Sequence, residues 1–480
     1  MQTQQFTNTT NNEQKSKMFP LNPALNFLGT EVSFNFSAEV AKVEKSGKFP
    51  KIYKFHIGDT GPRTADAIIS VAMQALKDKQ TKYGLFQGYP SVRENIANYL
   101  SKRHGADIKA ENILLMPGGK PAIELTMQTL IGPKDYVVGQ NPGYPIYESL
   151  ARFYGENRYL PWLARYSEQN KKLEFHTDDL EKILNEYHGR VKVLAVNTPQ
   201  NPTGMMLPKE TVRKIAELAM KYKFMVLFDD IYDQIVFGGR EHYSLLSIPG
   251  MLDYTINLNG YSKDFAMTGW RLGYVAAPKW LIEVFGKLAI NKWSCVNTVN
   301  QIVAGAIFGD VEVNGKTYKS VADEIAPLIK ADVAEYERKG NFLVNCLRLL
   351  EPYVVPNEVE GAFYEFPRVE KLLELPYVKK DLNIKNDVDF RLWLLHERGF
   401  ACLAGSDFGP GGKGHIRLSY AEDINEHIIP GVQHFMKIVI ELVEKSGLTA
   451  PLRMGEVEGR VRKKVDKYFR KYDFTMPDYG

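Results

Sequence analysis

The sequence predicts an α/β protein in which a mostly parallel sheet, covered by helices on both faces, is joined to a smaller α+β domain. The first observation is that short apolar segments alternate with helical ones from Asn112 to Ala277, a pattern typical of parallel sheets. The second is that after Ala277 the helical segments become longer and strand-like stretches become rare. The third is composition, because 44% hydrophobic and 25% charged residues over 480 positions are typical of globular chains with two or three domains.

The first 62 residues are predicted to contain a tail and an arm. Residues 1–17 are polar and almost free of large apolar side chains, so they cannot bury enough surface to fold, and we expect disorder there. Residues 18–62 are assigned to an N-terminal arm that completes the smaller domain. Within this arm, Ser37 to Lys45 has the periodicity of a short amphipathic helix, and Ile52 to Ile57 is strand-like.

Residues 63–320 are predicted to form the large domain. Helices are expected over Ala65 to Lys77 and Ser91 to His104, and a long helical run over Leu281 to Phe308. The strands of the expected sheet are Ile113 to Met116, Tyr136 to Val138, Val193 to Val196, Met225 to Asp229, Tyr254 to Leu258 and Gly273 to Ala276. Sites in such sheets lie at the carboxyl ends of the strands.

Residues 321–446 are predicted to form the rest of the smaller domain, and residues 447–480 a basic C-terminal extension. The expected helices are Pro327 to Leu350, Asp387 to Arg398 and Ile424 to Lys445, and the expected strands are Val354 to Phe366 and His415 to Tyr420. In the extension, every fourth residue from Val457 to Phe469 is apolar, which marks one helical stripe. We favour packing of this stripe on the body over contact with nucleic acid or a membrane.

Charge, cysteine usage and missing motifs exclude several classes of function. A net charge of +4 is small for this length, so no nucleic-acid partner is expected. The 3 scattered cysteines form no C-x-x-C pair, which argues against a disulfide framework and favours a reducing, cytoplasmic setting. No apolar run approaches the length of a membrane span, and no signal is recognised at the N-terminus. Neither a histidine metal-ligand spacing, nor G-x-S-x-G, nor a P-loop occurs, so no metal is expected.

Polar residues that could form a site follow the predicted strands. Gly118, Gly119 and Lys120 lie between a strand and a helix start, where backbone N–H groups can bind an anion, although a simple tight turn is an equally good interpretation. Asn201 follows another strand within an N-P-T-G segment, which on its own is usually a turn. Asp229 closes a further strand, where a carboxylate needs a cationic partner; an ion pair within the protein is the commoner arrangement.

Lys263 and Arg271 indicate the chemistry. Lys263 follows the strand that ends at Leu258, and Arg271 lies shortly after it in a second apolar segment. A lysine that attacks a carbonyl and an arginine that binds a phosphate suit pyridoxal phosphate, which carries both groups. For a random pair of this kind, ordinary surface charges would be the better interpretation.

Two tyrosines and an arginine complete the candidate set. Tyr144 could lay its ring on a flat heterocycle, and Tyr232, three residues after Asp229, could direct its hydroxyl to the same molecule. Core packing is the alternative for both tyrosines. Arg417 lies in the alternating segment Ile416 to Ser419 and suggests bidentate binding of a carboxylate, with a buried ion pair as the alternative.

Taken together and in this order, these residues resemble those of the class I and II pyridoxal-phosphate-dependent aminotransferases, which have the aspartate-aminotransferase fold. The match extends from about Ser33 to Val443. Its most specific piece is SKDFAMTGWRLGY, supported by NPTG, by GGK and by the spacing of Asp229 and Tyr232. Asp230 stands where the family more often has Glu.

The resemblance implies a role for each candidate residue. Lys263 would bond covalently to the cofactor, Asp229 would pair with its pyridine nitrogen, and Tyr144 would stack on its ring. The implied partners of the ring oxygen are Asn201 and Tyr232. The implied phosphate ligands are Gly119, Lys120, Ser262, Arg271 and, from a second subunit, Tyr83. The implied substrate ligands are Gly58, Asn201 and Arg417.

The activity implied by the resemblance is transfer of the α-amino group of an amino acid to a 2-oxo acid, by a ping-pong mechanism through Lys263, in a homodimer with shared active sites. The first alternative is a pyridoxal-phosphate-dependent lyase, cyclase, decarboxylase or oxidase acting on an amino acid, because the same cofactor permits those outcomes. A ligand-sensing regulator on the same fold is a remote alternative, supported only by the basic C-terminus.

Overall fold

The computed structural model describes residues 21–29 and 32–469, so the disorder predicted for residues 1–17 lies outside the described residues. Its centre is a seven-stranded sheet in which the strand order is β2, β10, β9, β8, β7, β3, β4. Within this sheet β10 runs antiparallel to both neighbours, and the other pairs are parallel. The strands are β2 (Ile113–Met116), β3 (Tyr136–Asn141), β4 (Tyr159–Leu163), β7 (Val191–Asn197), β8 (Met225–Asp229), β9 (Thr255–Gly260) and β10 (Gly273–Ala276). The predicted fold class is confirmed.

Every strand predicted for the large sheet belongs to it, whereas β4 is a strand that the sequence pattern missed. Its sequence is Tyr-Leu-Pro-Trp-Leu, and Pro161 has no N–H to donate to a ladder. A proline is tolerated in an edge strand, and β4 lies at the edge, paired with β3. The proline therefore made the strand difficult to predict from the sequence but did not prevent it from forming.

Helices cover both faces of the sheet. Along β8, Leu227 packs on one face, and Val226 and Phe228 pack on the other, as the two-residue repeat of a strand requires. The first face is covered by α5 (Lys120–Leu130), α6 (Pro145–Tyr154) and α9 (Lys279–Trp293). The second face is covered by α7 (Thr177–Glu186) and α8 (Lys209–Tyr222).

The helical run predicted from Leu281 to Phe308 is broken in the structure. Ser294 has a φ of +63°, outside the helical region, and ends α9. The side chain of Asn297 then accepts hydrogen bonds from two backbone N–H groups in the first turn of the next helix and caps it. That helix is α10 (Thr298–Ala306), which packs against α3 (Asp66–Lys77) and α4 (Pro90–His104).

The N-terminal segment joins the C-terminal part of the chain, as predicted. Strand β1 (Tyr53–Lys54) pairs in parallel with β14 (Phe400–Ala401), and α2 (Val32–Lys45) lies beside α13 (Asp387–Arg398). A second small sheet has the order β13 (Tyr364–Glu365), β16 (Ile416–Ser419), β15 (Leu403–Ala404). Two further helices of this part are α12 (Glu370–Leu373) and α14 (Ile429–Lys445).

Two strands predicted for this part are much shorter than expected. The segment Ile52 to Ile57 contributes the two residues of β1, and Val354 to Phe366 contributes the two residues of β13. In the second case Ala362 has a φ of +55°, which interrupts the extended conformation just before Tyr364. Alternation of apolar residues was present in both segments, but a partner strand was available only over a short length.

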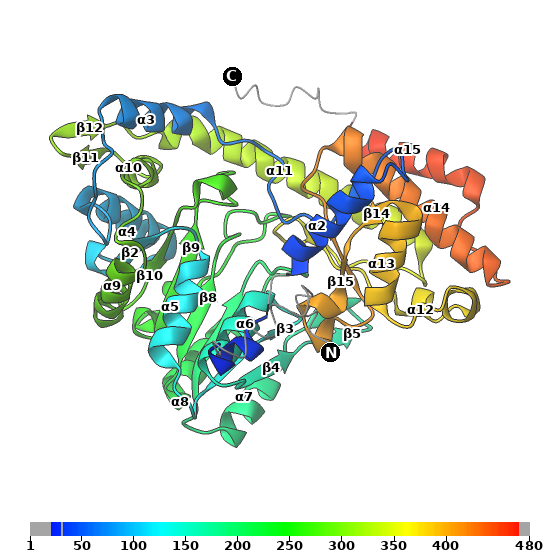
Figure 1. Cartoon of the computed structure of the whole chain (residues 1–480), viewed down its shortest axis with the longest axis horizontal. Helices are drawn as coiled ribbons and strands as arrows, with labels where there is room; N and C mark the ends of the chain where they lie inside the picture. Colours follow the sequence, from blue (N-terminus) through cyan, green and yellow to red (C-terminus); the bar gives the residue numbers. More distant parts are fainter. Residues whose placement is uncertain (1–20, 30–31, 470–480) are drawn as a thin grey trace.

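Helix α11 (Ala322–Leu347) spans the molecule in Figure 1, from the neighbourhood of α3 and α10 to that of α15 (Val457–Tyr468). The apolar stripe of the C-terminal extension lies on α15, where Val457 and Val461 are buried against the core that includes α11 and α14. The prediction that this stripe packs on the body is confirmed. Two short hairpins, β5 (Arg165–Ser167) with β6 (Lys172–Glu174) and β11 (Val311–Val313) with β12 (Lys316–Tyr318), complete the described fold.

Candidate functional site

The carboxyl edge of the large sheet brings together residues that are far apart in the sequence. Strands β7 and β8 end side by side, because Asn197 pairs with Asp229 in their register. Strand β9 ends at Gly260, shortly before Lys263, and β2 ends just before Gly118. Parallel strands in this arrangement open a crevice at one edge, which is where ligands bind in such sheets.

Asp229 is the most unusual group at this edge. Its side chain is 5% exposed and accepts hydrogen bonds from the hydroxyl of Tyr147 and from the backbone N–H of Ile231, the latter at 3.1 Å. Burial raises the pKa of Asp229 to about 7, against the opposing effect of those two hydrogen bonds. Within the described part of the chain no lysine, arginine or histidine forms an ion pair with it. The carboxyl group is therefore buried with donors but without a cation.

Lys263 connects the sheet to the N-terminal arm. Its Nζ donates a hydrogen bond to the carbonyl oxygen of Gly58 and lies 5.5 Å from the centroid of the Phe363 ring. Gly58 is closely surrounded, because a Cβ at this position would lie 3.1 Å from the hydroxyl of Tyr364. The lysine and Gly58, which were predicted for the catalytic and substrate-binding roles, are thus in direct contact.

Arg417 is held rigidly beside the same residues. The side chain is 2% exposed; Nη1 donates to Oδ1 of Asn201 at 2.9 Å, and Nη2 donates to the carbonyl oxygen of His56 at 2.8 Å. Its guanidinium lies 4.5 Å from the centroid of the Tyr364 ring. A small cavity adjoins Arg417, with Asn201 and Tyr144 in its wall. The guanidinium is oriented by these two hydrogen bonds and lies in the wall of this small cavity.

His56 adds no second charge next to Arg417. Burial, followed by the positive charges of Arg417 and Lys54, lowers the pKa of His56 to about 3, so its ring is neutral near neutral pH. It was not predicted from the sequence, where it is one histidine in an undistinguished strand-like segment.

Tyr232 and Asn201 both contact residues of this group. The hydroxyl of Tyr232 is 2.9 Å from the hydroxyl of Tyr364. The backbone N–H of Asn201 donates to Oδ1 of Asn197 at 2.8 Å, which fixes the loop after β7. Both residues are buried, and both lie in the network that contains Arg417 and Asp229.

Glycines and an arginine form a tight cradle at the start of α5. Gly118 has a φ of +93°, and a Cβ there would lie 2.3 Å from Nη2 of Arg271. A Cβ on Gly273 would lie 2.7 Å from the carbonyl carbon of Gly118, so the two chain segments are in backbone contact. Gly119 is the N-cap of α5, and Lys120 is its first residue, with Nζ 5.1 Å from the ring of Phe34.

The three other candidate residues, Ser262, Tyr144 and Tyr83, differ in how far they are buried. Ser262 is buried next to Lys263. Tyr144 precedes α6, half-buried, with its ring edge-on to that of Tyr147 at 5.5 Å. Tyr83 is 88% exposed.

Tyr147 is a residue of the site that sequence reasoning did not identify. It is on α6, is fully surrounded by protein, and donates its hydroxyl to Oδ2 of Asp229. Its spacing of three residues from Tyr144 was the available signal, since residues at this distance share a helix face. That signal was too common to single out one tyrosine among 26.

Comparison with known proteins assigns the family. Residues 52–428 match the family model described as aminotransferase class I and II. The chain is 31% identical over 366 residues to an aspartate aminotransferase of Pyrococcus abyssi, which covers 76% of this chain and 86% of that protein.

The chain belongs to the class I and II aminotransferases.

Other aminotransferases are comparably similar. An aromatic-amino-acid aminotransferase of Thermococcus litoralis is 30% identical, with 77% of this chain and 87% of that protein covered. Among solved structures, an alanine aminotransferase from Pyrococcus furiosus has a TM-score of 0.74 at 27% identity, covering 88% of this chain and 100% of that chain. The protein is therefore an enzyme that transfers amino groups, in a family that uses pyridoxal phosphate.

Two further structural findings concern membrane-spanning helices and metal sites. None of the helices that the structure describes has both the length and the apolar character needed to cross a membrane. In the same residues, His, Cys, Asp and Glu form no group of three or more that could hold a metal ion.

Proposed function

We propose that this aminotransferase binds pyridoxal phosphate at the carboxyl edge of its large sheet and moves an amino group from an α-amino acid to a 2-oxo acid. The observations that carry the proposal are the contact of Lys263 with Gly58 and the buried carboxyl group of Asp229, which has no cationic partner among the described residues. The sequence motifs around these residues match the family, and the fold brings them to one edge.

The environment of Asp229 fits the ring of the cofactor. A protonated pyridine nitrogen is a cationic donor, and such a donor would stabilise the charged form of a carboxyl group whose pKa burial has raised. The hydroxyl of Tyr147 and the N–H of Ile231 already orient the carboxyl oxygens. Asn201 and Tyr232, on the neighbouring loops, would donate to the ring oxygen, and Tyr144 would stack on the ring.

The cradle at the start of α5 fits a phosphate. Backbone N–H groups in a helix's first turn have no partner within the helix, and the helix dipole favours an anion there. Gly119, Lys120 and Ser262 would supply donors, and Arg271 lies against Gly118 at the same place. The close approach of these segments explains why side chains other than hydrogen are excluded at Gly118 and Gly273.

In the proposed reaction the chain's own residues bind the amino acid and move its α-proton. Arg417 binds the α-carboxylate with its oriented guanidinium, assisted by Asn201 and Gly58. The amine of Lys263 removes a proton from the α-carbon. Asp229 would hold a proton on the ring nitrogen of the cofactor. The chemistry that pyridoxal phosphate would supply when bound is an acceptor for the electron pair released at the α-carbon and a carrier for the amino group.

A homodimer with shared sites is part of the proposal. Tyr83 is 88% exposed, so its side chain is available to the site of a second subunit. The helix before it presents an exposed apolar face formed by Ile69, Met73 and Leu76, and Leu85 is exposed just after it. An apolar face of this kind, next to the implied phosphate ligand, favours an interface between two copies. Three unbridged cysteines support a cytoplasmic location.

The test of the cofactor proposal is spectroscopic and kinetic. Purified protein incubated with pyridoxal phosphate and freed of excess cofactor is expected to show a visible absorbance band, which Lys263→Ala abolishes. With 2-oxoglutarate as acceptor, a panel of aspartate, alanine and aromatic donors is expected to give ping-pong kinetics with at least one donor. A band that persists in Lys263→Ala, or turnover of an amino acid without any 2-oxo acid, would contradict the proposal.

Shared sites are tested by mixing two inactive variants. Lys263→Ala supplies an intact Tyr83, and Tyr83→Ala supplies an intact Lys263. Dimers that contain one chain of each kind have one complete site, so activity is expected to return after mixed refolding. If the mixture stays as inactive as its components while each elutes as a folded dimer, Tyr83 does not act across the interface.

A further inference from the structure

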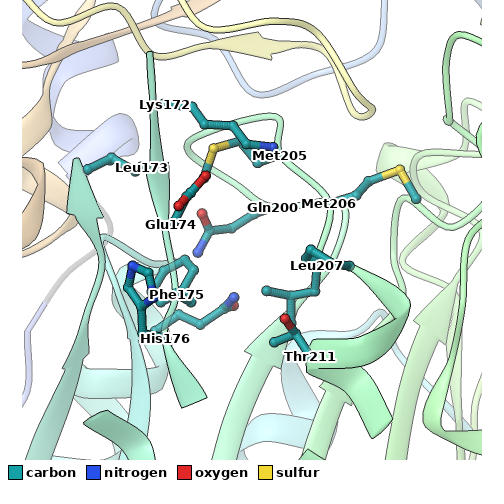
Figure 2. A pocket seen from close by; sticks show the side chains of 12 residues that line it. Lys172, Leu173, Glu174, Phe175, His176, Gln200, Met205, Met206, Leu207 and Thr211 are labelled. Carbon is teal, nitrogen blue, oxygen red and sulfur yellow. The ribbon is translucent and has the colours of Figure 1, made fainter. Parts of the chain in front are cut away.

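The loop that carries Asn201 has less support from packing on one of its sides. A cavity of about 280 Å³ lies between this loop and strand β6, and Gln200 and Met206 of the loop are in its wall. In Figure 2, Met205 of the loop and Lys172 of β6 lie at the same end of this cavity. Fewer van der Waals contacts form across a cavity, so the position of the loop depends more on its hydrogen bonds.

The loop closes on itself next to Asn201. The backbone N–H of Gln200 donates to the carbonyl oxygen of Met205 at 2.9 Å, and the N–H of Gly204 donates to the carbonyl oxygen of Gln200 at 2.8 Å. Asn201 is therefore joined through Gln200 to the last residues of the loop. A contact that holds Met206, the residue after Met205, also limits the movement of Asn201.

The segment 360–364 lies beside the end of this loop. The N–H of Gly361 donates to the carbonyl oxygen of Gly204 at 3.0 Å, and a Cβ on Gly204 would lie 2.4 Å from the carbonyl oxygen of Tyr364. The two backbones are thus in contact. The ring centroid of Tyr364 is 4.5 Å from the guanidinium of Arg417, so the same segment connects the loop to the candidate site.

Glu360 adds a buried carboxyl group to this contact. One of its oxygens accepts a hydrogen bond from the backbone N–H of Met206 at 2.7 Å, and the other accepts from Nζ of Lys172 at 2.8 Å. A charged acceptor forms a stronger hydrogen bond with an N–H than a neutral acceptor does. The lysine supplies the counter-charge that a buried carboxylate requires. Glu360 therefore binds the end of the loop and strand β6 together.

A neighbouring ion pair shows what is particular to Glu360. Lys171, the residue before Lys172 on the same hairpin, pairs with Glu351 at 2.8 Å. Both pairs connect the hairpin to the stretch between α11 and β13. The side chain of Glu351 is 30% exposed and that of Glu360 is 10% exposed. Among the described residues, the backbone of the Asn201 loop donates to Glu360 and not to Glu351.

We propose that Glu360, supported by Lys172, is a positioning residue that holds Asn201 in place for the reaction. The contact keeps Asn201 where its Oδ1 accepts from Nη1 of Arg417 at 2.9 Å. It also keeps the side-chain amide nitrogen of Asn201 available for the ring oxygen of the cofactor. The second of these roles rests on the proposed function, whereas the contact with Arg417 does not.

Two double variants isolate the hydrogen bond to Met206. Both carry Lys172→Met, so that neither leaves a lysine without its partner. Glu360→Gln then retains an acceptor for the N–H of Met206, and Glu360→Met, of similar size, removes it. The Glu360→Met variant is expected to have a KM for 2-oxoglutarate at least about fivefold above that of the Glu360→Gln variant, because Arg417 loses a group that orients it. Equal KM values would overturn the proposal.

Glu351→Met is the matched control for these variants. It breaks the neighbouring ion pair with Lys171 but leaves the hydrogen bond between Met206 and Glu360 in place. Its KM for 2-oxoglutarate should equal that of the parent enzyme. A rise in KM as large as that of the Glu360→Met variant would show that any weakening of the hairpin has this effect, and would overturn the specific role of Glu360.

The absorbance of the bound cofactor reports on Asn201 without turnover. A ring oxygen that loses a donor is protonated more readily, so the pH at which the visible band changes is expected to be higher in the Glu360→Met variant by at least about 0.5 units. The Glu360→Gln and Glu351→Met variants should match the parent protein. Coincident pH profiles for the two double variants would overturn the proposal.

Amide hydrogen exchange of the cofactor-free protein tests the contact without the cofactor. In the unmodified protein the N–H of Met206 is expected to be protected. Residues 198–207 are expected to exchange at least about tenfold faster in the Glu360→Met variant than in the Glu360→Gln variant. An unprotected N–H at Met206, or equal exchange in the two variants, would overturn the proposal. The absence of a visible band in the parent protein would instead contradict the proposed function, and the exchange comparison would still decide the role of Glu360.

Discussion

Two consecutive aspartates, the last residue of strand β8 and the residue after it, differ in their partners. On one side, Asp230 accepts three side-chain hydrogen bonds, from His242 at 2.8 Å, Ser244 at 2.9 Å and Asn257 at 2.6 Å. On the other side, Asp229 has two donors and no cationic partner in the described chain. Both carboxyl groups are buried.

The difference in partners between Asp230 and Asp229 distinguishes a carboxylate that stabilises the protein from one that is available to a ligand. Burial alone would lower the pKa of His242, but the carboxylate of Asp230 outweighs it and raises that pKa, so the pair supplies its own counter-charge. At Asp229 burial dominates, and the pKa rises to about 7. Both aspartates are buried, so burial does not distinguish them. Asp229 lacks a cationic partner among the described residues, and this indicates that it is the aspartate available to a ligand.

The largest expected effect comes from Asp229→Asn. Asparagine is nearly the same size but cannot hold a negative charge opposite a pyridine nitrogen, so kcat/KM is expected to fall by about 10²–10³. The thermal midpoint of the cofactor-free protein should not fall, because the variant removes a poorly compensated carboxyl group. Steady-state kinetics and calorimetry check both statements. A kcat/KM within about tenfold of that of the parent enzyme would contradict the functional role assigned to Asp229.

Asp230→Asn is expected to affect stability instead. The variant removes the carboxylate that raises the pKa of buried His242 and accepts its hydrogen bond, and the free energy of unfolding is expected to fall by about 3 kcal/mol. Urea denaturation measures this change. The double variant Asp230→Asn, His242→Gln serves as the control, since it removes both charges and should recover part of the loss. A double variant less stable than the single one would exclude the ion pair as the cause.

The effect of Asp229 on the pH dependence of stability is isolated by comparing the parent protein with the Asp229→Asn variant. Because its pKa is raised from 3.8 to about 7 in the folded chain, the folded state retains a proton that the unfolded state loses. The contribution of Asp229 to stability is therefore fully present below about pH 4 and is lost as the pH rises to about 7. The cofactor-free protein should lose stability relative to Asp229→Asn across this window, as measured by urea denaturation. Parallel curves for the two proteins would show that Asp229 ionises normally.

The smallest expected effect belongs to Tyr147→Phe. The variant removes one donor to Asp229, which raises the pKa of that carboxyl group further and is expected to lower kcat/KM by about fivefold to tenfold, equivalent to about 1 kcal/mol. Tyr154→Phe is the matched control on the same helix, since the Tyr154 hydroxyl donates to Glu124 at 3.1 Å, away from the site. Equal activity of the two variants would show that Tyr147 does not support Asp229.

The sequence by itself determined where six of the seven strands of the large sheet lie along the chain, and that Asn201, Asp229 and Lys263 lie at or after the ends of strands. This was possible because strand and helix periodicity is a property of residues near one another in the chain, and parallel strands place their carboxyl ends at one edge. The same local signals were misleading where a strand lacked a long partner, as in the segment before Phe366, or where a proline masked an edge strand, as at Pro161.

Only the tertiary structure decided which of these groups have partners. Arg417 and Asn201 are separated by 216 positions, and Tyr147 and Asp229 by 82, so no local pattern could indicate their contacts. The consecutive aspartates look equivalent in the sequence and differ only in what packs against them. Hydrogen bonding and burial depend on neighbours brought together by folding, and these determine which polar residues stabilise the protein and which are available to a ligand.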